Sequence, residues 1–470
     1  MTTIHLDNIK RAYFIGIGGI GVSALAKLFL YQGKRVEGSD SSSSEITNDL
    51  TAKGVKIYIG QKAENLSADF DLVIFSDAVP EDNPERIKAK ELKIIELSYF
   101  EVLGEISKQK RTIAITGAHG KTTTTAMTGL TLKNAGFDPT IIVGSKIKQL
   151  ENSNFSPGKS DYFVVEACEY RAHMLKIEPK VIILTNIDEE HLDYYKDLAH
   201  IVDTFQKFVD KLSGDNILVY NNDDQNIEKL ILPDCQKISY GIFNNADIVA
   251  KDIATLNGKV TFTVKYKSNE LGNFSLQVPG VHNIYNALAV IACGLKLDIP
   301  LEKIKESLEN YQGAWRRFDH IGNLKINGGE AKVISDYGHH PTEVKATIKA
   351  AKEFYPKERL FVVFQPHLHS RTKKLFTDFT ESFDLADVLV LSEIYFVRGR
   401  EEEEDQNVSS NDLAKEIRKR PEIINKKTEV IYSENLDTTY DLILKNAKAD
   451  DVILVMGAGD IYDVAKRLVE

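Results

Sequence analysis

The stretch TIAITGAHGKTT, residues 112–123, decides the fold class of this chain. Its apolar start, Thr112–Ile115, predicts a buried strand, and a helix is expected from Lys121 to about Asn134. A strand, a glycine-rich turn and a helix follow one another in that order in phosphate-binding loops. The amides of such a turn surround phosphate oxygens, while Lys121 can reach the β and γ phosphates and Thr122 can hold Mg²⁺.

This phosphate loop is a compact variant, because Ile115 stands where the full motif has its first glycine. The alternative is an ordinary strand–helix turn, which the Gly-Lys-Thr sequence in this context disfavours. We therefore predict that the loop binds the phosphates of a nucleotide. The predicted nucleotide-binding residues are Gly117, Ala118, His119, Gly120, Lys121, Thr122 and Thr123.

A second glycine turn lies nearer the N-terminus, in the sequence GIGGIG at residues 16–21. It stands between an expected strand, Ala12–Ile15, and an expected helix, Ile20–Tyr31, and Asp40 ends the next strand about twenty residues on. This arrangement fits a diphosphate at a helix N-terminus, as in NAD, NADP or a UDP-sugar. The alternative is a glycine turn that only lets helix and strand pack closely. The predicted ligand-binding residues are Gly16, Gly18, Gly19, Ile20, Gly21, Ser39 and Asp40.

Strands alternate with helices along most of the chain, which predicts an α/β protein with parallel sheets. Residues 241–278 instead alternate with period two, so an antiparallel excursion is expected there. The polar stretch Glu105–Arg111 indicates a first boundary, and Tyr311–Arg317 is a candidate for the second one. We expect three domains: a Rossmann-like domain at 1–108, a phosphate-loop domain at 109–313 and a second Rossmann-like domain at 314–470.

Acidic and imidazole groups follow two strands of the middle region. Glu166 ends the strand at Asp161–Val165, and His191 follows the strand at Val181–Leu184. Ligands of open parallel sheets bind beyond the carboxyl ends of the strands, so both side chains should lie near the phosphate loop. A carboxylate and an imidazole suit Mg²⁺ or Mn²⁺. Each residue alone has a plainer interpretation, Glu166 as a surface carboxylate and His191 as a structural histidine.

Two histidine-containing loops follow strands of the last region, DYGHHP at 336–341 and QPHLHSR at 365–371. Their spacing lacks the helical pair of a zinc protease and no cysteine joins them, so a zinc site is disfavoured. Histidines and an arginine that orient an anionic substrate and stabilise transition-state charge fit better.

Composition limits the class of protein. The chain has 470 residues, a formal net charge of −10, 43% hydrophobic and 27% charged residues, which is ordinary for a globular protein. The acidic balance makes a nucleic-acid binder unexpected. Three widely spaced cysteines indicate no disulfide framework. Lys10 and Arg11 before an apolar run mimic a signal peptide, but the glycines of residues 16–21 argue against it. We expect a cytoplasmic protein without a membrane anchor, either a monomer or a weak homodimer.

Two other classes of function compete at this point. An NAD-dependent oxidoreductase would explain residues 16–21 and Asp40, but not Lys121 or the double histidine. A non-catalytic nucleotide switch would keep Gly120-Lys121-Thr122 but would not need Asp336 or His339.

Taken together, the motifs resemble the Mur ligase family over nearly the whole chain. The glycine turn GIGGIG resembles the members that add L-alanine. The histidine within the phosphate loop and the double histidine are the most specific of the shared motifs. The matching stretches, in chain order, are 16–21, 38–40, 117–125, 166–170, 185–187, His191-Leu192-Asp193, 282–283, 286–287, 316–318, 336–343 and 365–367.

The resemblance implies three domains and ATP-dependent joining of L-alanine to UDP-N-acetylmuramate, through an acyl phosphate, in peptidoglycan precursor synthesis. A nearer alternative is the recycling ligase that attaches a tripeptide to the same sugar. The resemblance also implies that Thr122, Glu166 and His191 hold the metals. Adenine contacts would come from Asn283 and Asn286. The ATP and amino-acid side of the site would be lined by Arg317, Asp336, His339, His367 and Arg371. The implied catalytic residues are Lys121, His191, Asp336, His339 and Arg371.

Overall fold

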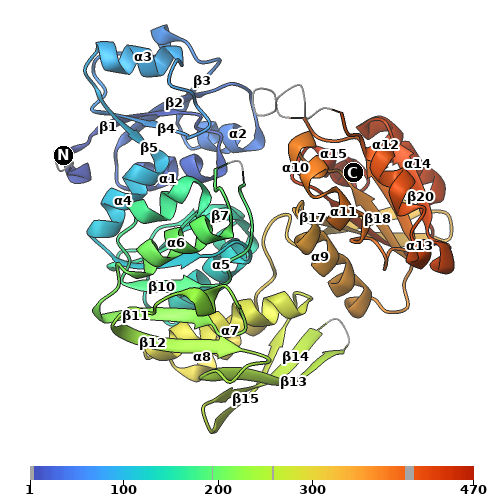
Figure 1. The fold of residues 1–470 in the computed structure, drawn as a ribbon. Helices are drawn as coiled ribbons and strands as arrows, with labels where there is room; N and C mark the ends of the chain where they lie inside the picture. Colours follow the sequence, from blue (N-terminus) through green and yellow to red (C-terminus); the bar gives the residue numbers. More distant parts are fainter. Residues whose placement is uncertain (1–4, 193, 257–258, 397–406) are drawn as a thin grey trace. The chain divides into compact units, whose positions relative to one another are not determined.

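The computed structural model describes residues 5–192, 194–256, 259–396 and 407–470 (Figure 1). Three sheets follow one another along the chain, with five, ten and six strands. Contacts divide the chain into two compact units. The first unit comprises Met1–Asp252, Phe262–Phe274 and Ile284–Tyr311, and the second comprises Ile253–Thr261, Ser275–Asn283 and Gln312–Glu470.

The N-terminal sheet is parallel throughout, with strand order β3-β2-β1-β4-β5. The order reverses between β1 and β4, and ligands of such sheets bind in the crevice at that point, beyond the carboxyl ends of the strands. Its elements are β1 (Arg11–Ile15), α1 (Ile20–Tyr31), β2 (Arg35–Asp40), α2 (Glu45–Ala52), β3 (Lys56–Ile59), β4 (Leu72–Phe75), α3 (Pro84–Glu91), β5 (Ile95–Ser98) and α4 (Tyr99–Lys108).

The central sheet has the order β15-β14-β13-β12-β11-β10-β6-β9-β7-β8. Its middle strands are parallel, while β8 is antiparallel to β7. Only two residues join β14 to its neighbour β15, which requires an antiparallel hairpin. Its strands are β6 (Arg111–Thr116), β7 (Thr140–Ile147), β8 (Ser153–Ser156), β9 (Tyr162–Glu166), β10 (Val181–Leu184), β11 (Gly214–Asn221), β12 (Cys235–Gly241), β13 (Ile248–Leu256), β14 (Lys259–Tyr266) and β15 (Asn269–Leu276). Its helices are α5 (Lys121–Asn134), α6 (Leu198–Val209), α7 (Val281–Lys296) and α8 (Leu301–Glu309), and the 3₁₀ segment η4 spans Tyr170–Lys176.

The C-terminal sheet has the order β16-β17-β21-β18-β19-β20, and only the edge strand β16 runs antiparallel. Its strands are β16 (Asp319–Ile326), β17 (Gly329–Asp336), β18 (Leu360–Phe364), β19 (Val388–Ser392), β20 (Glu429–Ser433) and β21 (Val452–Met456). Its helices are α9 (Pro341–Phe354), α10 (His369–Lys374), α11 (Phe376–Thr380), α12 (Ser410–Ile417), α13 (Pro421–Lys426), α14 (Leu436–Asn446) and α15 (Ile461–Arg467).

The strands β10, β18 and β21 are apolar along their whole length, as expected where helices cover both faces of a sheet. Every residue of β10, β18, β19 and β21 is buried. One hydrophobic core extends from the N-terminal sheet into the central sheet, and includes Phe14, Leu25, Phe163 and Leu184. The two glycine turns therefore belong to one packed body.

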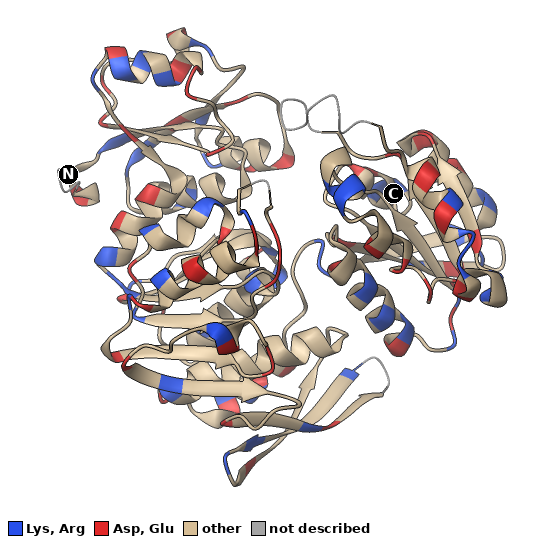
Figure 2. Ribbon diagram, in the orientation of Figure 1, with Lys and Arg blue, Asp and Glu red and all other residues tan. Residues whose placement is uncertain are grey.

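These observations confirm the predicted α/β class with three domains, including the antiparallel excursion after residue 241. The domain boundaries at 108 and 313 stay a prediction. Lys and Arg are interspersed with Asp and Glu along the chain (Figure 2). Cys168, Cys235 and Cys293 are free thiols. Among the described residues, no helix combines the length and apolar character that crossing a membrane requires.

Candidate active site

The loop between β6 and α5 needs glycine at two positions. Gly117 and Gly120 both have positive φ angles, 136° and 84°. A Cβ atom on Gly117 would lie 2.1 Å from the hydroxyl oxygen of Thr185, and one on Gly120 would lie 2.5 Å from Oδ1 of Asn286. Because both neighbours are packed against the loop, a larger residue would displace the backbone that has to follow the phosphates.

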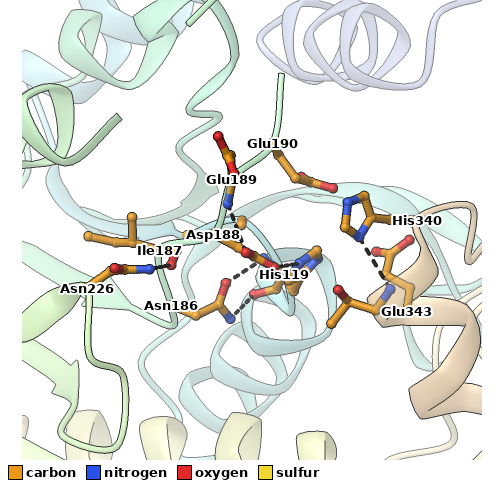
Figure 3. Close-up of polar contacts among 12 residues, drawn as sticks. His119, Asn186, Ile187, Asp188, Glu189, Glu190, Asn226, His340 and Glu343 are labelled. Atoms are coloured by element: carbon orange, nitrogen blue, oxygen red, sulfur yellow. Dashed lines mark hydrogen bonds and ion pairs between the residues drawn. The ribbon is translucent and has the colours of Figure 1, made fainter. Parts of the chain in front are cut away.

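The loop is held in place by the segment that follows β10. The backbone N–H of His119 donates to Oδ1 of Asn186 at 2.8 Å, and Nδ2 of Asn186 donates to the carbonyl of His119 at 3.0 Å (Figure 3). The hydroxyl of Thr185 donates to the same carbonyl at 2.7 Å. Nε2 of His119 lies 3.0 Å from Asp188. The loop is thus preorganised, and the first-turn N–H groups of α5 have no acceptor within the helix.

Lys121 begins α5 and folds back over its own loop. Its ammonium group donates to the carbonyls of Gly117 at 2.6 Å and Ala118 at 2.8 Å, and it lies 2.9 Å from Oε2 of Glu169. Burial alone would lower the pKa of Lys121, but Glu169, together with Cys168 and Glu190, outweighs burial and the pKa is raised. Burial likewise works against the charged form of Glu169, yet Lys121 and His191 lower its pKa to about 2. The site therefore contains a buried ion pair at neutral pH.

Thr122 and Glu166, two of the predicted metal ligands, are brought together. The Thr122 hydroxyl donates to Oε2 of Glu166 at 3.2 Å, and the backbone N–H of Gly144 donates to Oε1. A Cβ atom on Gly144 would lie 2.9 Å from both carboxylate oxygens, so only glycine fits there. A hydroxyl and a carboxylate at the end of a phosphate loop are the donors that Mg²⁺ takes alongside phosphates and water. The residues present therefore fit the ion.

His191, the third predicted metal ligand, contacts other carboxylates. Its Nε2 lies 3.1 Å from Glu169 and 3.8 Å from Glu190. The ligand atoms of these three residues all lie within 4.8 Å of one another. His191 has a φ of 58°, so its backbone is held in the left-handed region that non-glycine residues rarely adopt. Asp193 of the same motif lies outside the described residues.

Sequence reasoning missed Glu169 and Glu190 as site residues. Glu169 stood within the quoted stretch 166–170, three residues after Glu166, but nothing in the local pattern showed that it would pair with Lys121. Glu190 precedes His191 in an acidic run, which resembles a solvated loop. Both depend on tertiary contacts that bring the segment after β9 next to the segment after β10.

One of the two predicted adenine contacts is adjacent to the phosphate loop. Oδ1 of Asn286, on α7, accepts a hydrogen bond from the Thr124 hydroxyl at 3.1 Å. Tyr285, beside it, donates to Asp223 at 2.7 Å. Asn283 lies three residues earlier on the same helix, and its Nδ2 donates to the carbonyl of Pro279 at 2.7 Å. The roles of both asparagines toward a nucleobase stay predictions.

The other glycine turn, residues 16–21, connects β1 to α1. Gly16 has a φ of 76°, and a Cβ atom there would lie 3.1 Å from Cβ of Ser76. The N–H of Gly18 donates to Oδ2 of Asp40 at 2.8 Å. Gly19 is the N-cap of α1, so the turn ends at a helix N-terminus, as a diphosphate requires.

Ser39 differs from its neighbour Asp40. The Ser39 side chain is fully buried and donates to Oε2 of Glu85, whose other oxygen accepts a hydrogen bond from Tyr13 at 2.9 Å. The hydroxyl is thus engaged inside the domain. Asp40 is partly exposed at the end of β2, and it is the member of this pair that a ligand can reach.

The second unit contains the remaining predicted residues, beginning with Asp336 at the end of β17. Its carboxylate accepts hydrogen bonds from the N–H groups of Phe318 and Gly338, both at 2.8 Å. Burial raises its pKa. Arg317 lies 3.6 Å from Glu343, and its guanidinium stacks over Tyr337 at 5.3 Å. Glu343 was quoted in the motif without a role and is a further residue that sequence reasoning missed.

The Glu343 carboxylate also holds His339. Its N–H donates to Oε2 of Glu343 at 3.1 Å, and its Nδ1 lies 3.1 Å from the carbonyl of Tyr337. Burial lowers its pKa to about 3, although Glu343 works in the opposite direction. The ring is therefore neutral at physiological pH and can both donate and accept a hydrogen bond.

This neutral ring predicts a loss of stability in acid. The pKa of His339 is about 3 in the folded state and 6.5 when unperturbed, so the unfolded chain binds the proton first. The contribution of neutral His339 to the free energy of unfolding is complete above pH 6.5. It decreases as the pH falls toward 3, by about 2 kcal/mol at pH 5. Denaturant unfolding at pH 7.5 and 5.0 should show a smaller decrease in His339→Asn than in the wild type. Equal decreases would contradict the assignment.

His367 and Arg371 lie together after β18. Nη1 of Arg371 is 3.4 Å from Nδ1 of His367, and the rings of His367 and His339 are 6.0 Å apart. His367 also stacks on Tyr395, with centroids 5.4 Å apart. Leu368, between them, has a φ of 71° and precedes α10. In the second unit, Asp336 and His339 thus lie at the carboxyl end of β17, and His367 and Arg371 lie after the carboxyl end of β18. Arg317 lies in the segment before β16.

Family models match three successive stretches of the chain. The "Mur ligase family, catalytic domain" matches residues 11–111, the "Mur ligase middle domain" matches 115–294, and the "Mur ligase, glutamate ligase domain" matches 316–459. Together they span most of the sequence.

Relatives match over the full length. The UDP-N-acetylmuramate–L-alanine ligase of Clostridium novyi is 44% identical over 469 residues, with 99% of this chain and 98% of the relative covered. The ligase of the same name from Alkaliphilus metalliredigens is 39% identical, with 100% and 99% covered. The crystal structure of the UDP-N-acetylmuramate-alanine ligase of Thermotoga maritima has a TM-score of 0.83 and 28% identity, with 97% and 98% covered. A murein peptide ligase of Psychrobacter arcticus has a TM-score of 0.70 at 23% identity, with 98% of each chain covered.

Proposed function

The chain belongs to the Mur ligase family, and from this membership we propose that it joins L-alanine to the lactyl carboxylate of UDP-N-acetylmuramate, using ATP. The product would be UDP-N-acetylmuramoyl-L-alanine, a precursor of peptidoglycan, together with ADP and phosphate. The observation that carries the proposal is the presence of two glycine turns, at residues 16–21 and 117–120, in one packed body. Two turns of this kind suit two different phosphate-bearing substrates.

The reaction needs ATP because a carboxylate and an ammonium ion do not condense in water at neutral pH. We propose that the lactyl carboxylate first attacks the γ phosphorus of ATP, which gives an acyl phosphate and ADP. The free amine of L-alanine then attacks the acyl carbon. The tetrahedral intermediate expels phosphate, and the amine loses a proton as the amide forms.

Lys121 and the amides of its loop have the main electrostatic role in the first step. The developing charge is spread over phosphate oxygens, and preorganised donors stabilise it with little reorganisation. Lys121 now binds two carbonyls of its own loop and Glu169, so the nucleotide has to draw its ammonium group away from some of them. Glu169 keeps the lysine charged and poised until then.

Thr122 and Glu166 would hold Mg²⁺, and Mn²⁺ would suit the same donors. Bound there, the ion would supply positive charge that neutralises part of the charge on the phosphates. His191, with Glu169 and Glu190, is the second group of donors near the loop. Within the second unit, the residues that the family resemblance assigns to ATP and the amino acid are Arg317, Asp336, His339, His367 and Arg371. The neutral ring of His339 can both donate and accept a hydrogen bond.

The alternative ligase, which adds a tripeptide to the same sugar, is less well supported. The murein peptide ligase structure is less similar in both sequence and fold than the L-alanine ligase structure. An NAD-dependent oxidoreductase would leave Lys121, Thr122 and Glu166 without a role.

The deciding experiment supplies ATP, UDP-N-acetylmuramate and an equimolar mixture of amino acids and the L-Ala-γ-D-Glu-meso-diaminopimelate tripeptide, and identifies products by mass spectrometry. We expect the L-alanine adduct to dominate, with ADP formed in equal amount. A dominant tripeptide adduct would establish the recycling activity instead. Hydrolysis of ATP without any adduct would refute the ligase.

A further inference from the structure

A buried histidine on η4 and one carboxylate oxygen that follows β4 have no hydrogen-bond partner among the described residues. His173, on η4, is only 8% exposed. Neither of its ring nitrogens has a hydrogen-bond partner among the described residues, and Oδ2 of Asp77 has none either. Nε2 and Oδ2 are 3.2 Å apart, without the alignment of a hydrogen bond. Buried polar atoms of this kind are costly in a folded protein, and a bound ligand is one way to satisfy them.

The two groups are not an ordinary ion pair. Burial lowers the pKa of His173 to about 4, and Lys176 and Arg171 add to the effect, while Glu101 opposes it. Burial also raises the pKa of Asp77. At neutral pH the ring is uncharged, so one nitrogen can donate a hydrogen bond and the other can accept one.

The ring of His173 is held in a fixed orientation by the neighbouring domain. It stacks on Phe100 of α4, with centroids 3.9 Å apart and an interplanar angle of 11°. The two residues that precede His173, Arg171 and Ala172, both have left-handed backbone angles, with φ of 49° and 57°. Consecutive non-glycine residues in this conformation are strained, and such strain concentrates at functional sites.

Asp77 lies where a ligand of this sheet has to pass. It follows β4, and its neighbour Ser76 lies against Gly16 of the glycine turn. The strand order reverses between β1 and β4, so the crevice opens between residues 16–21 and residues 76–77. In sheets of this kind the ribose lies at the end of β2, here Asp40, and the rest of the ligand crosses toward β4. The part beyond the diphosphate is therefore expected on the side of Asp77 and His173.

We propose that Asp77 and His173 bind the sugar ring of the UDP-sugar, with Asp77 accepting a hydrogen bond from a sugar hydroxyl or the acetamido N–H. The inference rests on the proposed function, because the sugar nucleotide is its ligand. A carboxylate repels both the diphosphate and the lactyl group, so its partner has to be a neutral donor. The His173 ring completes the contact with an oxygen or N–H of the same sugar.

The decisive variant is His173→Phe, which keeps an aromatic ring on Phe100 and removes both ring nitrogens. We expect the KM for UDP-N-acetylmuramate to rise about 10- to 100-fold, the loss of one or two hydrogen bonds to a ligand. The KM values for ATP and L-alanine should stay unchanged. Asp77→Asn should raise the same KM. Calorimetry should show weaker binding of UDP-N-acetylmuramate and unaltered binding of UDP.

A matched control is Lys176→Met, because Lys176 lies three residues after His173 and joins η4 to α4 through Glu101, 3.0 Å away. It should keep the wild-type KM and melt at a similar temperature. His173→Phe should melt no lower than the wild type, since an apolar ring replaces an unsatisfied polar one.

Three outcomes would overturn the inference. An unchanged KM in His173→Phe would mean that water alone satisfies the pair. An equal loss of affinity for UDP would place the pair on the nucleotide side of the ligand. An equal effect of Lys176→Met on the KM would mean that packing is responsible. A wild-type protein that binds the sugar nucleotide but forms no adduct would refute only the proposed function, because calorimetry still tests the pair.

Discussion

Replacing Lys121 with alanine is expected to lower ligation at least about 100- to 1,000-fold, the usual effect of removing one preorganised donor to a developing charge. Lys121 is the cation that begins α5, within hydrogen-bond distance of the loop carbonyls of Gly117 and Ala118. The measurement is L-alanine-dependent ADP release with UDP-N-acetylmuramate. Binding of the sugar nucleotide alone should not change, because residues 16–21 belong to a different turn.

The same change leaves Glu169 buried without its cation, and breaking a buried pair is destabilising. The double variant Lys121→Ala with Glu169→Gln removes that complication and should melt closer to the wild type while remaining inactive. Lys133→Ala, at the other end of α5 and bonded to Ser156, is the control for loss of a lysine from this helix. Undiminished turnover in folded Lys121→Ala would refute the role of the loop.

Replacing Glu166 with glutamine is expected to lower activity about 100-fold and to raise the Mg²⁺ concentration needed for half-maximal rate. Glutamine keeps the shape of the side chain that Thr122 and Gly144 hold, so the loop should stay folded. It removes the charge that a hard cation requires. Titrating Mg²⁺ at saturating ATP measures both effects, and excess Mg²⁺ should restore part of the rate.

The control is Glu178→Gln, because Glu178 is a half-exposed carboxylate that pairs with Lys211. It should leave the Mg²⁺ requirement unchanged. If Glu166→Gln had the wild-type Mg²⁺ dependence, the Thr122 and Glu166 donors could not be the metal site, and the carboxylates around His191 would have to take that role.

The features that could be predicted from sequence are those that depend on short stretches. The strand, glycine turn and helix around residues 117–120 are consecutive, so their order alone fixes where the loop lies on the sheet. The same holds for residues 16–21. Apolar runs such as Val181–Leu184 predicted buried strands because helices cover both faces of a parallel sheet.

The features that could not be predicted depend on contacts between distant segments. Glu169 pairs with Lys121 across 48 positions of sequence, and His191 meets Glu169 rather than completing a set with Thr122 and Glu166 alone. The partner of Ser39 is a further example, because successive residues of a strand face opposite sides of the sheet, and the Ser39 side chain is hydrogen-bonded to Glu85 in the interior. Its predicted role toward a ligand stays a prediction. No local sequence pattern predicts these tertiary contacts.

The most direct test of the account follows the oxygen atoms of the lactyl carboxylate. UDP-N-acetylmuramate carrying ¹⁸O in both carboxylate oxygens is incubated with the wild-type protein, ATP and L-alanine, and the released phosphate is analysed by mass spectrometry. If the carboxylate attacks the γ phosphorus, one ¹⁸O atom leaves with each phosphate and the other stays in the new amide. Phosphate without the label, released in step with the L-alanine adduct, would contradict phosphoryl transfer to the sugar.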